Sequence, residues 1–291
     1  MTRIAYVNGR YLPHRDASVH IEDRGYQFAD GVYEVCEVFG GAIIDPTRHL
    51  DRLERSLSEL SIRPPMARAA LAGILREVVR RNRVRDGLVY LQVTRGSAPR
   101  DHAFPPAATR PAVVVTARAS DRVKADRLAA EGVKVITLPD NRWDRVDIKS
   151  ISLLPNVLAK EEARRAGARE AWFVDADGNV TEGASTNAWI VTADGDLVTR
   201  PADHGILRGI TRTAVIEMAH DRDIRVIERP FTVAEAKAAR EAFMTAATTV
   251  VMPVVQIDDA VVANGNPGSV ATGLRARFHD AVERVAAGVQ S

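Results

Sequence analysis

Lys149 is the residue whose type and surroundings most favour covalent chemistry in this chain of 291 residues. Of the 40 basic residues only five are lysines, and four of these read as solvated charges: Lys124, Lys134, Lys160 and Lys237. Lys149 instead follows Ile148 and comes shortly before apolar residues at positions 151, 153 and 154. An amine becomes a nucleophile when burial or a neighbouring cation lowers its pKa, because the protonated form has no lone pair. We therefore predict that Lys149 forms a Schiff base with a carbonyl compound.

Glu182 supplies the carboxylate that one kind of Schiff-base chemistry needs. It stands in residues 180–187, after an expected strand and before Gly183. In pyridoxal phosphate enzymes a carboxylate keeps the pyridine nitrogen protonated, so that the ring takes up electrons when the substrate Cα proton leaves. A lone glutamate at such a place is otherwise a turn residue. We interpret Lys149 and Glu182 together as the hypothesis of a pyridoxal phosphate site.

Residues 205–211 are a candidate phosphate site. The segment contains Gly205 and Gly209 and leads directly into an expected helix, whose first backbone N–H groups and dipole attract an anion. Arg52, which lies off the apolar stripe of another expected helix, can add a charge-assisted contact. The alternatives are a bare helix cap and a surface arginine.

The loop at residues 95–102 is a candidate carboxylate site. In an extended loop Arg100 and His102 point the same way and Asp101 the other, so two donors can bind one substrate carboxylate. Tyr33 can supply a hydroxyl to the same anion or simply pack. A polar loop with incidental charges is the alternative.

The composition excludes several other classes of function. Cys36 is the only cysteine, so neither a disulfide framework nor a thiolate metal cluster is possible within the chain. We find no HExxH, GxSxG, Walker or GxGxxG motif. The net charge is only +2, and Lys and Arg interleave with Asp and Glu, which argues against nucleic-acid binding.

The sequence also predicts a cytoplasmic globular protein without a membrane partner. Apolar residues make up 46% and charged residues 27% of the chain, close to the averages for globular proteins. No apolar run reaches the roughly 18 residues that a membrane helix needs. Residues 1–5 are expected to open a strand and not a signal peptide.

The first part of the chain reads as an α+β domain. Strands are expected at residues 32–39, 88–94 and 112–118, after a hairpin at Asn8 and Gly9. Two amphipathic helices are expected, one beginning near Pro46 and the other at about residues 68–81. We therefore predict a small N-terminal α+β domain at residues 1–118, with helices on one face of a sheet, followed by a polar interdomain linker at 119–131.

The second part reads as a larger, strand-rich domain at residues 132–291. It begins with a strand at 133–138, continues with a helix at 155–165, and then forms a strand meander that contains Glu182. A helix at 211–220 follows Gly209, a strand is expected at 254–262, and an amphipathic helix with Val285 in its apolar stripe ends the chain. Lys149 and the candidate phosphate site both belong to this expected domain.

Several motifs at matching spacing resemble the fold-type IV, or class IV, pyridoxal-phosphate aminotransferases. They are residues 22–35, 49–53, 147–150, 181–187 and 206–212, and the resemblance covers nearly the whole chain. It implies a two-domain fold with α+β and α/β halves, pyridoxal 5'-phosphate between the domains, and a homodimer. By resemblance, the implied roles are Schiff-base lysine for Lys149, pyridine partner for Glu182, phosphate ligand for Arg52, packing near the ring for Leu207, and phosphate cup for Ile210 and Thr211, next to Gly209.

The segment at residues 92–102 looks most like that of the D-amino acid transaminases. In these an Arg-x-His pair and a tyrosine, here Arg100, His102 and Tyr33, trap the substrate α-carboxylate. The side of the cofactor that holds the carboxylate decides which enantiomer turns its Cα hydrogen toward the lysine. The chain departs from that group at residues 246 and 247, which are alanines where hydroxyl residues commonly lie near the phosphate. Thr248 is the residue that can compensate.

The expected activity is transfer of the amino group of a D-amino acid, such as D-alanine or D-glutamate, to a 2-oxo acid such as 2-oxoglutarate or pyruvate. The two half-reactions would follow a ping-pong scheme. A branched-chain L-amino acid transaminase, an (R)-amine transaminase and an aminodeoxychorismate lyase are the alternatives with the same fold. A non-catalytic carrier of pyridoxal phosphate is the alternative from another class.

Overall fold

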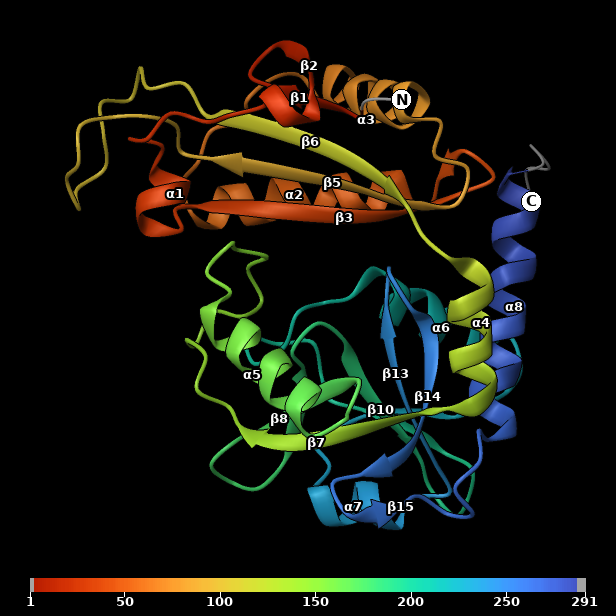
Figure 1. Cartoon of the computed structure of the whole chain (residues 1–291). Coiled ribbons are helices and arrows are strands. Elements are labelled where there is room, and N and C mark those ends of the chain that lie inside the picture. Colours follow the sequence, from red (N-terminus) through yellow and green to blue (C-terminus); the bar gives the residue numbers. More distant parts are fainter. Residues whose placement is uncertain (1–2, 287–291) are drawn as a thin grey trace. The chain divides into compact units, whose positions relative to one another are not determined.

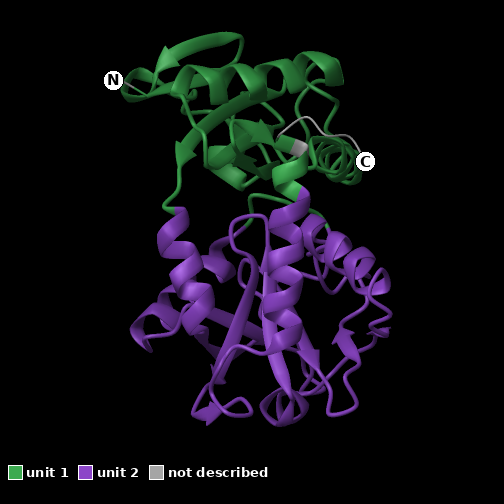
Figure 2. Ribbon diagram, turned by 90° about the vertical axis from the view of Figure 1, so that its right-hand side faces the viewer, with its two compact units in different colours: residues 1–121, 148–152, 282–291 green, residues 122–147, 153–281 purple. Residues whose placement is uncertain are grey.

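The computed structural model describes residues 3–286, except for the side chain of Val285. Residues 1–2, the start of the expected first strand, and residues 287–291 lie outside the described part, as does the predicted apolar contact of Val285. The chain divides into two compact units, which Figure 1 draws by sequence position and Figure 2 by unit. Unit 1 is Met1–Asp121, Ile148–Ser152 and Val282–Ser291, and unit 2 is Arg122–Asp147 and Leu153–Ala281.

Unit 1 contains a six-stranded antiparallel sheet in the order β2-β1-β6-β5-β3-β4. The strands are β1 Ile4–Val7, β2 Arg10–Pro13, β3 Gly31–Phe39, β4 Ala42–Ile43, β5 Gly87–Thr94 and β6 Ala112–Ala119. The helices are η1 His14–Asp16, α1 Arg24–Phe28, α2 Pro46–Glu59 and α3 Arg68–Asn82. The expected strands and both expected long helices of this part are present, and α1 is an additional turn of helix.

The two faces of this sheet differ in burial. Alternate residues of β3, among them Val32, Cys36 and Val38, are buried against apolar residues of α2 and α3, which form one core with them. The helices fold against this face because Leu50, Leu53 and Leu57 recur at helical spacing on α2. The other face carries Tyr33 and its neighbours on β5, and these side chains are only half-buried.

Unit 2 contains a nine-stranded mixed sheet in the order β12-β11-β10-β13-β14-β7-β8-β9, with β15 paired to β14. The strands are β7 Val133–Pro139, β8 Glu170–Val174, β9 Val180–Gly183, β10 Asn187–Val191, β11 Leu197–Thr199, β12 Val226–Glu228, β13 Glu241–Ala246, β14 Val250–Ile257 and β15 Ala260–Val261. The helices are α4 Arg122–Glu131, α5 Leu154–Arg165, α6 Ile210–His220, α7 Val233–Ala238 and α8 Ser269–Ala286. The last residues of α8 group with unit 1.

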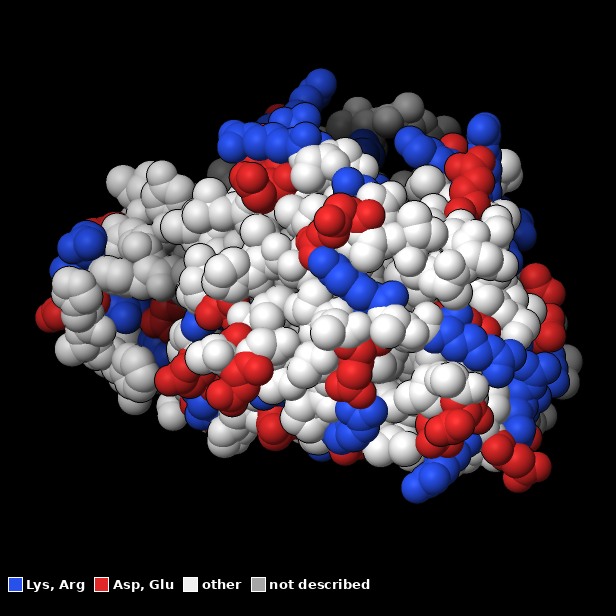
Figure 3. Space-filling model, turned by 90° about the horizontal axis from the view of Figure 1, so that it is seen from below, with Lys and Arg blue, Asp and Glu red and all other residues white. Residues whose placement is uncertain are grey.

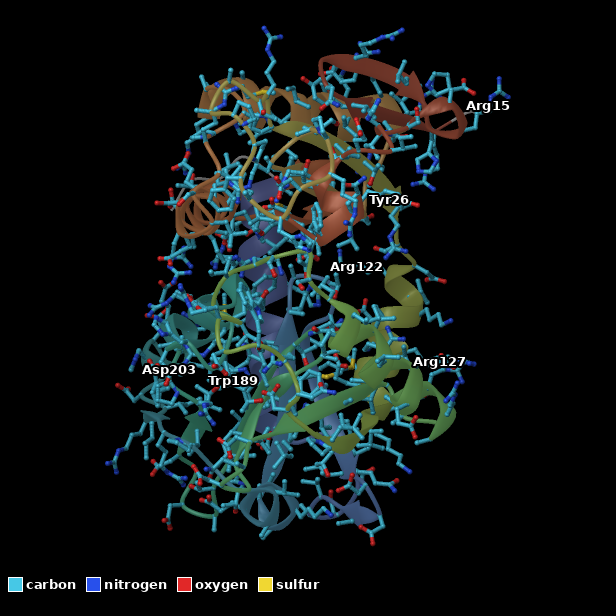
Figure 4. All side chains as sticks on the ribbon, turned by 90° about the vertical axis from the view of Figure 1, so that its left-hand side faces the viewer. Arg15, Tyr26, Arg122, Arg127, Trp189 and Asp203 are labelled. Atoms are coloured by element: carbon cyan, nitrogen blue, oxygen red, sulfur yellow. The ribbon has the colours of Figure 1, made fainter. Side chains whose placement is uncertain are left out.

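The core of unit 2 is built on the centre of this sheet. Trp189 on β10, labelled in Figure 4, stacks on Phe243 of β13 with ring centroids 5.5 Å apart. Its indole N–H donates to the Thr245 hydroxyl at 3.0 Å. The centre of the sheet, at β10 and β13, is therefore built from buried side chains, and the polar group of Trp189 has a hydrogen-bond partner there.

Three features differ from the sequence-based expectation. Residues 119–131, expected as a polar interdomain linker, contain the end of β6 at Ala119 and the helix α4 from Arg122, in which Ala129 is buried and Arg127 pairs with Glu131. The single strand expected at 254–262 is the end of β14 and a short β15 joined by a turn. The segment Ile148–Ser152, expected in the C-terminal domain, groups with unit 1.

Charges of both signs are mixed on the surface of the protein (Figure 3). On the face drawn in Figure 3, Lys and Arg side chains lie among Asp and Glu side chains. Within residues 3–286 no helix is both long and apolar enough to cross a membrane. Over the same residues no group of three or more His, Cys, Asp or Glu side chains is arranged to hold a metal ion.

Candidate active site

Lys149 is held in unit 1 by backbone bonds to the start of β3. The Lys149 carbonyl accepts from the Tyr33 N–H at 3.0 Å, and the Ile151 N–H donates to the Gly31 carbonyl at 3.0 Å. A side chain at Gly31 would not fit, since its Cβ would lie 2.6 Å from the Val93 carbonyl oxygen. Gly31 therefore allows the close approach of β3 to β5, and the Lys149 segment adjoins β3 through an isolated antiparallel bridge between Ser150 and Val32.

The Lys149 amine lies over an aromatic ring. Its Nζ atom is 4.2 Å from the centroid of the Tyr33 ring, so the structure brings these two predicted residues together. The Tyr33 ring in turn stacks on Tyr90 at 5.8 Å. Burial, with a smaller contribution from Tyr33, raises the pKa of Tyr90 to about 12, and its hydroxyl donates to Gln92 at 2.6 Å. Tyr90 therefore stays a neutral support under Tyr33.

Arg52 lies on α2 and is fixed by a buried carboxylate of β3. Its Nε and Nη2 atoms both donate to Glu34, at 2.8 Å each, in a bidentate pair. His49 lies 2.7 Å from the same carboxylate. Burial by itself would raise the pKa of Glu34, but Arg52 and His49 outweigh it and hold the value at about 2. Arg52 is therefore not a freely moving surface arginine, because its guanidinium is paired with the negative charge of Glu34.

Glu182 lies at the centre of a hydrogen-bond network in unit 2. The Leu207 N–H donates to both of its carboxylate oxygens at 3.2 Å, and the Asn187 amide donates to Oε2 at 3.1 Å. The residue is only 5% exposed. The interpretation of Glu182 as a simple turn residue does not account for this burial, because a buried carboxylate requires partners.

Arg142 is the partner of Glu182 that the sequence did not indicate. Its Nη1 atom donates to Glu182 Oε1 at 2.5 Å, and it also pairs with Asp140 at 2.7 Å. Burial raises the pKa of Glu182, and Arg142 is the largest of the influences that lower it again. No local pattern around residue 142 marks it, since the pairing joins segments far apart in the sequence.

The helix start at α6 is next to Glu182 through Asn187. Gly209 is the N-cap of α6 and makes no side-chain cap. A Cβ at Gly209 would lie 2.1 Å from the Asn187 amide oxygen, and the Asn187 amide nitrogen donates to the Leu207 carbonyl at 2.9 Å. Thr211 is buried and Ile210 is half-buried in the first turn. Leu207, Gly209, Ile210 and Thr211 thus form one short segment whose first N–H groups can receive an anion.

The Thr248 and Thr249 side chains differ in burial. Thr248 is exposed, in the turn between β13 and β14. The next residue, Thr249, carries a buried hydroxyl oxygen without a hydrogen-bond partner in the described part of the chain. A buried unsatisfied hydroxyl is uncommon. A hydroxyl near this turn is therefore available, although at a position that the sequence did not single out.

Arg100 and His102 are brought together on one ring. The Arg100 guanidinium carbon lies 5.0 Å from the centroid of Phe28, and the His102 ring lies 5.4 Å from it. Both residues are exposed. Both side chains therefore approach the same aromatic ring of unit 1, and the carboxylate site stays a prediction.

Comparisons with known proteins agree with one another. A family model described as amino-transferase class IV matches residues 31–257. A D-alanine aminotransferase of Staphylococcus haemolyticus is 38% identical over 283 residues, which cover 97% of this chain and 99% of the relative. A D-alanine aminotransferase of Bacillus licheniformis is 38% identical over 275 residues, covering 94% and 95%.

Solved structures of similar fold extend the comparison. A T.th. branched-chain amino acid aminotransferase with pyridoxamine 5'-phosphate has a TM-score of 0.89 and is 27% identical, covering 100% of this chain and 96% of that one. A 4-amino-4-deoxychorismate lyase of Pseudomonas aeruginosa has a TM-score of 0.81 and is 27% identical, covering 95% and 98%.

Proposed function

Because the chain belongs to the amino-transferase class IV family, we propose that it is a pyridoxal 5'-phosphate-dependent transaminase that moves the amino group of a D-amino acid to a 2-oxo acid. The observation that carries this choice is the likeness to D-alanine aminotransferases over nearly the whole chain. D-Alanine and D-glutamate are the proposed donors, and pyruvate and 2-oxoglutarate the proposed acceptors. The two half-reactions follow a ping-pong scheme.

The residues of the chain fit the cofactor chemically. An aldehyde requires an amine, which Lys149 supplies, and a pyridine nitrogen requires a buried carboxylate, which Glu182 supplies. A phosphate requires uncapped N–H groups and a fixed cation, for which we propose Gly209, Ile210 and Thr211 of the α6 start, together with Arg52. Leu207 contributes a backbone N–H that orients Glu182. Thr248, or the buried hydroxyl of Thr249, completes the phosphate contacts.

Each proposed residue has a stated task in the reaction. When bound, pyridoxal phosphate supplies an aldehyde that receives the amino group and a ring that takes up the electron pair of the substrate Cα–H bond. Lys149 would move a proton between the substrate Cα and the cofactor carbon that carries the amino group. Glu182 holds a proton on the ring nitrogen. Arg100 and His102, with the Tyr33 hydroxyl, bind the substrate carboxylate and so orient the Cα–H bond toward the amine.

The test compares D- and L-alanine as amino donors, in the unchanged enzyme and in Lys149→Ala, by the absorbance of the cofactor. The cofactor absorbance of the purified enzyme should change on addition of D-alanine and not of L-alanine. In Lys149→Ala the rate of that change should fall by about 10²-fold or more, because proton transfer by a positioned side chain contributes that much. An undiminished rate in Lys149→Ala would refute the assigned role.

A branched-chain L-amino acid transaminase is the second candidate. It is favoured by the high structural similarity to a branched-chain aminotransferase, at 27% identity. L-Leucine separates the two candidates: turnover of L-leucine faster than that of D-alanine would replace the first proposal by the second. (R)-1-phenylethylamine and aminodeoxychorismate, added to the same panel, test the (R)-amine transaminase and lyase alternatives.

We also propose that the enzyme is a homodimer. Leu154, Val157 and Leu158 on α5 are 68%, 59% and 60% exposed. They stand at i, i+3 and i+4 and so share one face of the helix. Adjacent exposed apolar side chains are typical of a protein interface, and a second copy of this chain is the proposed partner.

Two other expectations stay predictions. The domain limits at residues 1–118 and 132–291, with 119–131 between them, predict that limited proteolysis cuts first within 119–131. The cytoplasmic location predicts that the protein is recovered with the cytoplasmic fraction of its source cells.

A further inference from the structure

Arg24 is a buried arginine of unit 1 to which the proposed chemistry gives no task. Its side chain is 4% exposed, and it is the first residue of α1. Its Nη1 atom donates to the Asp101 carbonyl at 2.6 Å, and Nη2 donates to the His102 carbonyl at 3.4 Å. One guanidinium thus binds the backbone of the loop at the two residues that follow Arg100.

Phe28, at the other end of α1, connects Arg24 with the side chains of the same loop. The Arg24 guanidinium lies 4.8 Å from the Phe28 centroid. The Arg100 guanidinium and the His102 ring approach the same ring at 5.0 Å and 5.4 Å. Arg24 and Phe28 therefore support both the backbone and the side chains of the proposed carboxylate donors.

The Arg24 guanidinium is itself fixed by Asp30. Arg24 Nε donates to Asp30 at 2.8 Å, and Arg95 binds the same carboxylate through two atoms, at 2.8 and 2.9 Å. Burial alone would raise the pKa of Asp30, but the bonds from Arg95 and Arg24 lower it below its usual value. Arg95 also donates to the carbonyls of Leu60 and Ser61. The Asp30 carboxylate that pairs with Arg24 therefore stays ionised, and Arg95 fixes its position relative to residues 60 and 61.

The rest of the loop is attached in other ways. Its first residues pair with the backbone at the start of α1: the Arg24 N–H donates to the Gly96 carbonyl at 2.9 Å, and Asp23 forms a bridge with Ser97. Its far end is held by Arg63, which donates to the carbonyls of Ala108 and Thr109 at 3.2 and 3.0 Å. Arg63 thus offers a matched comparison, because it binds carbonyls of the same loop away from the donors.

We propose that Arg24, supported by Phe28, is the positioning residue that holds Arg100 and His102 as a pair for the substrate carboxylate. The inference rests on the proposed function, in which these two side chains bind that carboxylate. Ordering two long polar side chains on binding has an entropic cost, and a preformed pair avoids part of it. Loss of Arg24 should therefore weaken the binding of carboxylate substrates and leave the chemistry at Lys149 largely unchanged.

The experiment compares Arg24→Leu, Phe28→Leu and Arg63→Leu with the unchanged holoenzyme. KM and kcat are measured for D-alanine, and the rate of tryptic cleavage after Arg100 is followed by mass spectrometry. In Arg24→Leu and Phe28→Leu the KM for D-alanine should rise about tenfold while kcat stays within about threefold. Cleavage after Arg100 should be faster in Arg24→Leu. In Arg63→Leu the KM should stay within about twofold.

Arg24→Lys is a second, more conservative variant, which keeps the test possible if Arg24→Leu does not fold. Arg24→Lys keeps the charge beside Asp30, but one ammonium group cannot reproduce the planar fork that reaches two carbonyls. Its KM should lie between those of the unchanged enzyme and Arg24→Leu. A KM for D-alanine within about twofold of normal in every folded Arg24 variant, or the same rise in Arg63→Leu, would overturn the proposal.

The two readouts separate this inference from the proposed function. If the unchanged protein does not turn over any D-amino acid, the proposed function fails, whatever the variants do. If it turns over D-alanine and Arg24→Leu shows a normal KM and normal cleavage after Arg100, only the positioning role of Arg24 fails.

Discussion

Arg142 is a second arginine whose task is to control another side chain. It forms an ion pair with Glu182, whose pKa is raised by burial, and so favours the ionised form of that carboxyl. A carboxylate that must keep a pyridine nitrogen protonated has to be ionised itself. Since burial favours the neutral carboxyl, the guanidinium of Arg142 and the N–H groups of Leu207 and Asn187 are what keep the ionised form accessible.

Replacement of Arg142 by Met should therefore shift the pH dependence of kcat. Without the guanidinium, the pKa of Glu182 rises further and the carboxylate is ionised only at higher pH. The acidic limb of the kcat profile should move to higher pH, and along that limb kcat should fall about tenfold for each unit by which the pKa of Glu182 rises. Arg127→Met is the control, because Arg127 is exposed and pairs with Glu131 on α4. A Glu182-linked limb at the same pH in both variants would contradict this role.

Among the helices, α6 is the one whose start we propose to bind the cofactor phosphate. It lacks a side-chain cap, so that its first N–H groups remain available to an anion. Gly209 lets the chain pass within van der Waals distance of Asn187, which in turn binds Glu182 and the Leu207 carbonyl. The proposed anion-binding end of the helix and the buried carboxylate of Glu182 are thus linked through the Asn187 amide.

Gly209→Ala should accordingly weaken cofactor binding. The added methyl group would lie 2.1 Å from the Asn187 amide oxygen, so Asn187 has to move and its bond to Glu182 is strained. The dissociation constant of pyridoxal phosphate, measured by titrating the apoenzyme, should rise about tenfold, or about 1.4 kcal/mol.

Gly73→Ala is the matched control for that titration. Gly73 lies within α3, and a Cβ there meets no atom within 4 Å. Alanine should stabilise the helix by about 0.5 to 1 kcal/mol without changing cofactor affinity. Equal affinities in the two variants would show that the approach to Asn187 is not important for the cofactor.

For the whole molecule, the exposed apolar face of α5 predicts the assembly. Val157→Asp places a charge among Leu154 and Leu158, where a second copy is proposed to bind. Sedimentation velocity should show the unchanged enzyme as a dimer and Val157→Asp shifted toward the monomer, because burying an unpaired charge costs several kcal/mol. Val123→Asp on α4, at a residue that is 80% exposed, is the control and should stay dimeric. Two dimers, or two monomers, would contradict the assignment of this face.

Much of the fold could be predicted from local pattern. The helices α2 and α3 follow from leucine and valine spacing, and β3, β5 and β6 from alternating or continuous apolar runs between turn residues. The helix α4, within the linker expected at 119–131, was not indicated by the sequence, because a polar helix with little apolar surface to bury has only a weak periodic signal.

The candidate site was predictable where chemistry restricts the residue type. Lys149 stood out because lysine is rare in this chain, and Glu182 and the glycines before α6 because they stand at strand and helix ends. Arg142, Arg24 and Thr249 were missed, since their importance comes from partners distant in sequence or from a buried hydroxyl without a partner.

By itself, therefore, the sequence determined the residue types available for the reaction and most of the elements that carry them, because both depend on side-chain chemistry and short-range periodicity. Only the tertiary structure decided that Lys149 pairs with β3 in unit 1, that Arg142 forms an ion pair with Glu182, and that Arg24 holds the loop of Arg100 and His102. These contacts join segments whose separation along the chain leaves no local pattern, and burial and charge pairing select them only when the chain has folded.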